Sequence, residues 1–160
     1  MSVRRREEDT PPPKRLTPLF LAALVILLDQ LTKTLAEAFL SPQTSLPILQ
    51  NFFHLTLVRN QGVAFGLFHE FEKVLLVIIT LSIGVLVVVG LRSGVSPWKV
   101  QVGTGLILGG AVGNWIDRIH YGAVIAFLDF RIWPVFNLAD TAITVGVGLM
   151  FIQGLKDHAS

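Results

Sequence analysis

The chain has 160 residues, of which 52% are hydrophobic and 15% charged, and its mean hydropathy of +0.64 exceeds that of a soluble domain, which indicates a single membrane domain. It has no cysteine, which excludes disulfides, thiolate chemistry and the usual zinc ligand sets, and its four histidines are too scattered to replace them, so we expect no metal. The net charge of +2 does not indicate a nucleic-acid partner, because most Lys and Arg residues are segregated to the ends and one loop, without interleaved aromatic residues.

A polar tail and four apolar segments make up most of the chain. Residues 1–15 are charged and proline-rich, so we expect a disordered tail. The apolar segments run from about Leu19 to Phe39, Val74 to Leu91, Val100 to Ile116 and Asn137 to Leu155, each close to the ~20 residues that a helix needs to cross a bilayer. Isolated strands cannot satisfy their backbone groups in lipid, so the sequence predicts an all-α membrane protein with four transmembrane helices.

The connection between the first two apolar segments is more than a simple loop. Residues 51–68, NFFHLTLVRNQGVAFGLF, combine β-branched and aromatic residues with a partial alternation that breaks at RNQG. This pattern favours a short sheet or hairpin at the membrane surface. The alternative is an ordinary amphipathic loop.

The distribution of Lys and Arg predicts the orientation. With four spans, eight of these residues lie on the side of the two termini and four on the other: Arg4, Arg5, Arg6, Lys14, Arg15, Arg92, Lys99 and Lys156 against Arg59, Lys73, Arg118 and Arg131. We therefore expect a cytoplasmic tail over 1–15, a transmembrane domain over 16–155 with external segments 40–73 and 117–136, and a second cytoplasmic tail over 156–160. A cleaved signal peptide ending near Ala38 is the weaker alternative, because Asp29 and Lys33 interrupt the apolar region.

Polar residues inside the spans follow helical spacing. Asp29, Lys33 and Glu37 share one face of the first span, and we favour a structural ion pair there. Gly105, Gly109 and Gly113 repeat every four residues in the third span, which indicates close helix packing.

Two polar groups lie near the external ends of the last two spans. Asn114, Asp117 and Arg118 end the third span, where the simplest structural expectation is a solvated helix end with an Asp–Arg pair. Asn137 and Asp140 begin the fourth span and share a face with Thr141 and Thr144. Asp140 is a candidate general acid or base, with structural capping as the alternative.

Four sequence blocks carry a resemblance to a known family. LDQLTK (28–33), RNQGVAFG (59–66), GGAVGNWIDR (109–118) and FNLADTAIT (136–144) resemble the motifs of signal peptidase II, the bacterial prolipoprotein signal peptidase. The resemblance implies a four-helix intramembrane aspartyl endopeptidase with an external β-cradle. It implies cleavage of diacylglyceryl-modified prolipoproteins before the lipidated cysteine, no cofactor, and inhibition by globomycin-type peptides. It also implies a site near the external face of the bacterial cytoplasmic membrane, and we expect a monomer.

The same resemblance assigns roles to particular residues. Asp140 matches one aspartate of the catalytic dyad, and Ala126 occupies the position of the other. The expected motif would read VIDFLDF, and this chain reads VIAFLDF. Substrate-binding or supporting roles carry over to Asn60, Asn114, Asp117, Arg118, Asn137, Asp29 and Lys33.

The alanine predicts an inactive chain. A natural loss and an engineered replacement both explain it, and we favour replacement because the other blocks are intact. Asp129 is the alternative dyad partner, but a shift of three residues along an extended strand would move the carboxyl by roughly 10 Å.

Two rival interpretations are a non-enzymatic transporter or channel subunit and a purely structural helical module. The first predicts internal repeats or acids near the midplane. The sequence shows no repeat, and its acids cluster towards one membrane face. The second leaves the pairing of the GNWIDR and FNLAD blocks unexplained.

The predicted topology can be tested by cysteine labelling, because the chain has no native cysteine. Single variants Arg5→Cys and Val95→Cys should react with a membrane-impermeant maleimide only after the cells are permeabilised. Labelling of either position in intact cells would contradict cytoplasmic termini.

Overall fold

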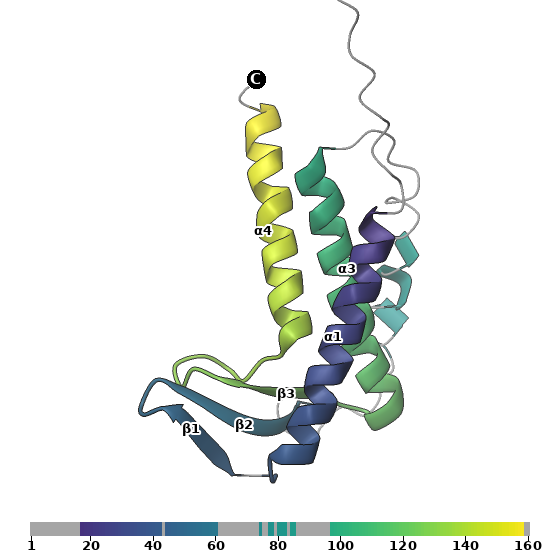
Figure 1. Cartoon of the computed structure of the whole chain (residues 1–160). Coiled ribbons are helices and arrows are strands. Elements are labelled where there is room, and N and C mark those ends of the chain that lie inside the picture. Colours follow the sequence, from purple (N-terminus) through teal and green to yellow (C-terminus); the bar gives the residue numbers. More distant parts are fainter. Residues whose placement is uncertain are drawn as a thin grey trace, which may run out of the picture.

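Three long helices and a three-stranded sheet make up the computed structural model, which describes residues 17–42, 44–60 and 97–158 and single positions between 74 and 85. The elements are α1 (Thr17–Phe39), β1 (Ser45–Leu49), β2 (Phe53–Asn60), α3 (Trp98–Tyr121), β3 (Val124–Asp129) and α4 (Leu138–His158). The helices run side by side with α3 against both α1 and α4, and the sheet lies across one end of them (Figure 1). The end of α4 lies away from the sheet.

Glycines set the close approach of α3 to both neighbours. A Cβ atom on Gly109 would lie 2.6 Å from Cβ of Val25 and 2.8 Å from the carbonyl oxygen of Ala22 in α1. On the other side of α3, a Cβ on Gly110 would collide with the backbone carbonyl of Ala139 in α4. Gly105 and Gly113 also face α1, so the packing role predicted for the four-residue ladder is confirmed.

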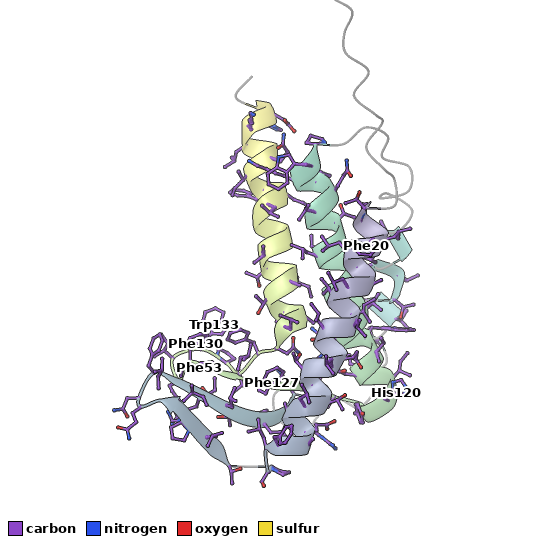
Figure 2. The ribbon with its side chains drawn as sticks, in the orientation of Figure 1. Phe20, Phe53, His120, Phe127, Phe130 and Trp133 are labelled. Atoms are coloured by element: carbon purple, nitrogen blue, oxygen red, sulfur yellow. The ribbon has the colours of Figure 1, made fainter. Side chains whose placement is uncertain are left out.

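The sheet is antiparallel, with strand order β1-β2-β3. Strand β2 confirms extended structure in the predicted segment 51–68 as far as Asn60, but its hairpin partner β1 lies before that segment. Residues 61–68 lie outside the described residues. A small apolar cluster of Ala36, Leu40 and Phe127 holds the sheet against the end of α1, where Figure 2 shows Phe127.

Two helices extend beyond the apolar segments of the sequence. The third helix continues to Tyr121, past the apolar segment that ends near Ile116, so residues 117–121 are helical. It ends at Gly122, whose left-handed φ of 65° lets its N–H donate to the carbonyl oxygen of Arg118. The fourth helix continues to His158, so residues 156–158 of the expected cytoplasmic tail are helical.

The structure supports some of the predicted membrane spans and does not describe others. In the described parts of the chain, α1 and α4 are long and apolar enough to cross a membrane. The described positions between 74 and 85 are helical, but most of the expected second span lies outside the described residues, as does the tail over 1–15. The structure therefore supports a mostly helical membrane protein without fixing four spans.

The packing of α3 against α4 predicts a contrast between two glycine substitutions. Gly110→Ala should lower the free energy of unfolding in detergent by about 1–3 kcal/mol, because the backbone of Ala139 cannot move aside as a side chain could. Gly148→Ala is the control, since a Cβ there meets nothing within 4 Å. Equal stability of the two variants would contradict this packing.

Candidate functional site

The first turn of α4 is capped by its own polar residues. Asn137 precedes the helix, and its side-chain oxygen accepts a hydrogen bond from the backbone N–H of Asp140 at 2.8 Å. In return, Oδ2 of Asp140 accepts one from the backbone N–H of Asn137 at 3.2 Å. Asn and Asp three residues apart therefore form a reciprocal cap, which fixes the Asp140 side chain against the helix start.

Asn114 of α3 connects this cap to the rest of the site. Its side-chain nitrogen donates to Oδ1 of Asp140 at 2.8 Å. Its oxygen accepts from the side-chain nitrogen of Asn137 at 3.0 Å and from Nζ of Lys33 at 3.1 Å. Both carboxylate oxygens of Asp140 therefore accept hydrogen bonds.

Lys33 of α1 lies between two carboxylates. Its Nζ is 2.7 Å from Asp29 and 2.7 Å from Asp117, and all three side chains are at most 2% exposed. The predicted ion pair of Asp29 and Lys33 is confirmed. The expected solvated pair of Asp117 with Arg118 is wrong, because Asp117 is buried and pairs with Lys33. Glu37, on the same helix face, instead pairs with Arg59 of β2 at 3.0 Å. Burial of a charge requires such compensation, and the α1–α3 interface supplies it.

The backbone of Ile125 is held from two sides. Its N–H donates to Oδ2 of Asp117 at 3.1 Å, and its carbonyl oxygen accepts from the side chain of Asn137 at 2.9 Å. The next residue is Ala126, which is 2% exposed and pairs with Val58 in the register of β2 and β3. The strand carrying position 126 is therefore fastened to the ends of both α3 and α4.

The remaining predicted residues lie around this cluster. Arg118 donates to the backbone oxygen of Asn114 at 3.1 Å. Asn60 ends β2 opposite Val124, two residues before Ala126. Hydrogen bonds and ion pairs join six residues into one network: Asp29, Lys33, Asn114, Asp117, Asn137 and Asp140.

Sequence reasoning missed Gln30, which belongs to the same network. Its side-chain nitrogen donates to Oδ1 of Asp117 at 2.9 Å and to the carbonyl oxygen of Gly113 at 3.2 Å. Its polarity inside an apolar helix was the available signal.

A cavity of about 360 Å³ reaches Asp140 from the aromatic side of the sheet. Phe130, Trp133 and Phe136 line one wall, and Thr141, Thr144 and Val145 of α4 line another. Figure 2 shows Phe53, Phe130 and Trp133 gathered at the same end of the sheet. An apolar wall that ends at a carboxylate can bind the apolar part of a substrate and place a polar bond of that substrate beside the carboxylate. Among the described residues, no group of three or more His, Cys, Asp or Glu side chains could hold a metal ion.

The comparisons with known proteins identify the family. A family model described as "Signal peptidase (SPase) II" matches residues 21–156. The chain belongs to this family. Curated relatives named "Lipoprotein signal peptidase" include that of Halothermothrix orenii, 44% identical over 81% of this chain and 88% of its own, and that of Pelotomaculum thermopropionicum, 46% identical over 84% and 89%.

Solved structures agree with this membership of signal peptidase II. Two structures described as a bacterial membrane enzyme superpose with TM-scores of 0.79 and 0.81 at 31% and 32% identity. The first match covers 89% of each chain, and the second covers 88% of this chain and 94% of the other. The shared fold is therefore that of a membrane enzyme.

Asp129 occupies a different environment from Ala126. Side chains alternate along a strand, so residues 126 and 129 project to opposite faces of β3. Asp129 accepts hydrogen bonds from Thr56 at 2.8 Å and from the backbone N–H of Arg131 at 2.8 Å, and its carboxylate also pairs with the Arg131 side chain. Its oxygens are thus committed to the sheet and its following turn, which argues against a catalytic role.

These contacts predict the titration of Asp129. Burial alone would raise the pKa of Asp129, but the hydrogen bonds from Thr56 and Arg131 outweigh burial and hold the pKa below its ordinary value of 3.8. Because the folded pKa is below the unfolded one, the contribution to stability is present above the unfolded pKa and is lost as pH falls through the folded pKa. Thr56→Val should raise the pKa of Asp129 in a carbon-13 NMR titration, while Thr44→Val, which alters only a turn hydroxyl, should not. An unchanged midpoint in Thr56→Val would contradict the assigned cause.

Proposed function

We propose that this chain is an intramembrane aspartyl endopeptidase that removes signal peptides from diacylglyceryl prolipoproteins before the lipidated cysteine, in a form inactivated by Ala126. The observation that carries this proposal is the arrangement around Asp140. Its carboxylate is held by Asn114 and Asn137 at the edge of an apolar cavity, and Asn137 also binds the backbone beside position 126.

Two carboxyls in this arrangement can perform general acid–base hydrolysis. Carboxyls placed close together share one proton, because both cannot ionise easily. The ionised member takes a proton from water as the water attacks the scissile carbonyl, and the protonated member polarises that carbonyl and later protonates the leaving amine. With alanine at 126, one of the two proton-handling groups is missing, so water activation fails.

The surroundings of Asp140 support a lipid-modified substrate. The aromatic wall of Phe130, Trp133 and Phe136 and the apolar helices beside it suit an acyl chain, and the carboxylate lies at its polar end. Exposed apolar side chains on β1 and after β3, including Leu46, Ile48, Ile132 and Trp133, suit the membrane interface. Relatives named as lipoprotein signal peptidases agree with this substrate class.

The same proposal includes the arrangement in the membrane. We assign four spans in the bacterial cytoplasmic membrane, both termini in the cytoplasm, the site near the external face, and a monomer that globomycin-type peptides inhibit. The sheet would then lie on the external surface, with Asn60 and Arg118 contacting the peptide. Two observations disfavour a transporter or channel subunit. The polar network ends at the junction of helices and sheet, and the chain belongs to a peptidase family.

Restoring the missing carboxyl tests the proposal. Ala126→Asp should raise cleavage of a diacylglyceryl-modified substrate by about 10²–10⁴-fold over the chain as given, the usual contribution of general acid–base assistance. The assay is the gel shift of the substrate after incubation in detergent or bilayers.

Two further variants in the Ala126→Asp background act as controls. Adding Asp140→Asn should abolish the gain, and adding Asp129→Asn should preserve it. Substantial turnover by the Ala126 chain, lost on Asp129→Asn, would refute the dyad assignment and identify Asp129 as the partner of Asp140.

A further inference from the structure

A line of four hydrogen-bonded side chains crosses the three-stranded sheet. Nδ1 of His54 lies 2.8 Å from the Ser45 hydroxyl oxygen, which lies 2.9 Å from the hydroxyl oxygen of Thr56. The Thr56 hydroxyl in turn donates to Oδ2 of Asp129 at 2.8 Å. The line therefore starts on β2, passes through the edge strand β1, returns to β2 and ends on β3. It shares no residue with the network that contains Asp140.

The number of available protons decides the direction of each hydrogen bond in this line. An ionised carboxylate only accepts, so Thr56 donates its single hydroxyl proton to Asp129. Ser45 must then donate its own proton to Thr56, because the two hydroxyl oxygens can share only that proton. Ser45 has no proton left for the ring, so Nδ1 of His54 donates to Ser45. The neutral ring consequently carries its hydrogen on Nδ1 and leaves Nε2 as a bare acceptor.

This direction holds as long as Asp129 is ionised. A protonated Asp129 could donate to Thr56, and the whole line would then reverse and place the ring hydrogen on Nε2. Arg131 opposes the reversal, because its backbone N–H donates to Oδ1 of Asp129 at 2.8 Å and its guanidinium lies 3.3 Å from Oδ2. Burial raises the pKa of Asp129, but the hydrogen bonds from Thr56 and Arg131 outweigh burial and keep the carboxyl ionised.

Nε2 of His54 is the end of the line that lacks a partner. The atom is buried, and no group in the described part of the chain forms a hydrogen bond with it. A second proton on the ring can be added only here, since Nδ1 already carries one. The new N–H would be charged and buried without an acceptor, which is unfavourable.

The charged groups around the line do little to compensate for a protonated ring. Asp129 is the carboxylate on the neighbouring strand β3, but Arg131 already pairs with it, and two hydroxyls separate it from His54. On the other side, β1 has the sequence SLPIL and carries no charge. A protonated His54 is therefore relieved only if its ring moves and brings Nε2 to water.

The edge strand β1 depends on the side chains that this line supplies. It pairs only with β2, and all five of its residues are exposed (Figure 1). Pro47 lies opposite His54 and has no N–H to donate to the ladder, and the register shifts between Pro47 and Leu49. The contacts of Ser45 with His54 and Thr56 thus join the two strands where the backbone ladder is interrupted.

We propose that His54 is an acid-sensitive latch, which holds β1 to the sheet while its ring is neutral and releases β1 when the ring takes up a second proton. Movement of the protonated ring breaks its contact with Ser45, and the short edge strand then loses a side-chain tie to β2. Because β1 exposes Leu46, Ile48 and Leu49, its release changes the apolar surface of the sheet. The latch does not depend on the proposed dyad or on activity.

The direction of the hydrogen bonds can be tested by nitrogen-15 NMR of histidine-labelled protein in detergent. The sequence contains four histidines, whose ring signals are assigned by single substitutions: His54, His69, His120 and His158. At about pH 8, Nε2 of His54 should resonate as an unprotonated nitrogen and Nδ1 as an N–H. A protonated Nε2 in the unmodified chain would overturn the proposal.

A matched pair of variants tests the same direction. Thr56→Val should move the proton of His54 to Nε2, because Ser45 no longer has Thr56 as an acceptor and can turn to donate to Nδ1. Thr44→Val, which alters only a turn hydroxyl, should leave the ring signals in place. An unchanged tautomer in Thr56→Val would contradict the proton count.

The latch itself is tested by hydrogen exchange of the β1 amides, expressed as protection factors so that the intrinsic effect of pH is removed. Protection of β1 should fall about five- to tenfold between about pH 8 and about pH 5, the range in which a histidine changes its charge. The amide of Leu128, which donates to Phe136 at 2.9 Å, is the internal reference and should keep its protection. Equal protection of β1 at the two pH values would overturn the latch.

Two variants separate the titration of His54 from other effects of acid. His54→Asn places an N–H donor near the position of Nδ1 but does not titrate, so the protection of β1 should become independent of pH. Ser45→Ala removes the contact at every pH, so protection should be low at both values. A loss of protection in His54→Asn equal to that of the unmodified chain would assign the effect to another group and refute the role of His54.

Discussion

The structure depends on one buried cation, the ammonium of Lys33, placed between the carboxylates of Asp29 and Asp117. Removing these charges from water costs several kcal/mol per ion, which the ion pairs offset only when every remaining polar atom also finds a partner. Here the partners come from the other elements: the backbone N–H groups of Ala139 and Ile125, and the side chain of Gln30. The requirement to satisfy one cluster thereby fixes α1, α3, α4 and β3 relative to one another.

The same requirement shapes the chemistry at Asp140. Asn114 and Asn137 each use both ends of their amides, so neither can turn without losing a bond. The Asp140 carboxylate consequently sits among donors that are already oriented, with an aromatic cavity on its open side. A preorganised acceptor of this kind needs little rearrangement when a substrate arrives, which is how such sites lower a reaction barrier.

The helices and the sheet have separate structural roles in placing the polar network. Close glycine contacts bring α3 against its neighbours, so the polar network fits within the helix interfaces. The sheet crosses the helix ends and carries position 126 on β3, next to the capped start of α4 (Figure 1). The polar cluster therefore lies where helices and sheet meet. Such a place suits a hydrolytic site, because water must reach it while the adjoining helices remain in an apolar environment.

Local patterns in the sequence determined the apolar helices, the hairpin strand up to Asn60, the pairing of Asp29 with Lys33, the packing glycines and the polar start of α4. Each follows from helical or strand periodicity within one element, and the alanine at 126 was visible from its motif alone. Tertiary structure decided which faces meet: Lys33 with Asp117 and Asn114, Glu37 with Arg59, and the aromatic wall with Asp140. Periodicity fixes the direction of a side chain around its own axis, but it does not specify the neighbouring element. The sequence also missed the continuation of α3 to Tyr121, because Asp117, Arg118 and His120 are as polar as a loop, and the helix ends only at Gly122.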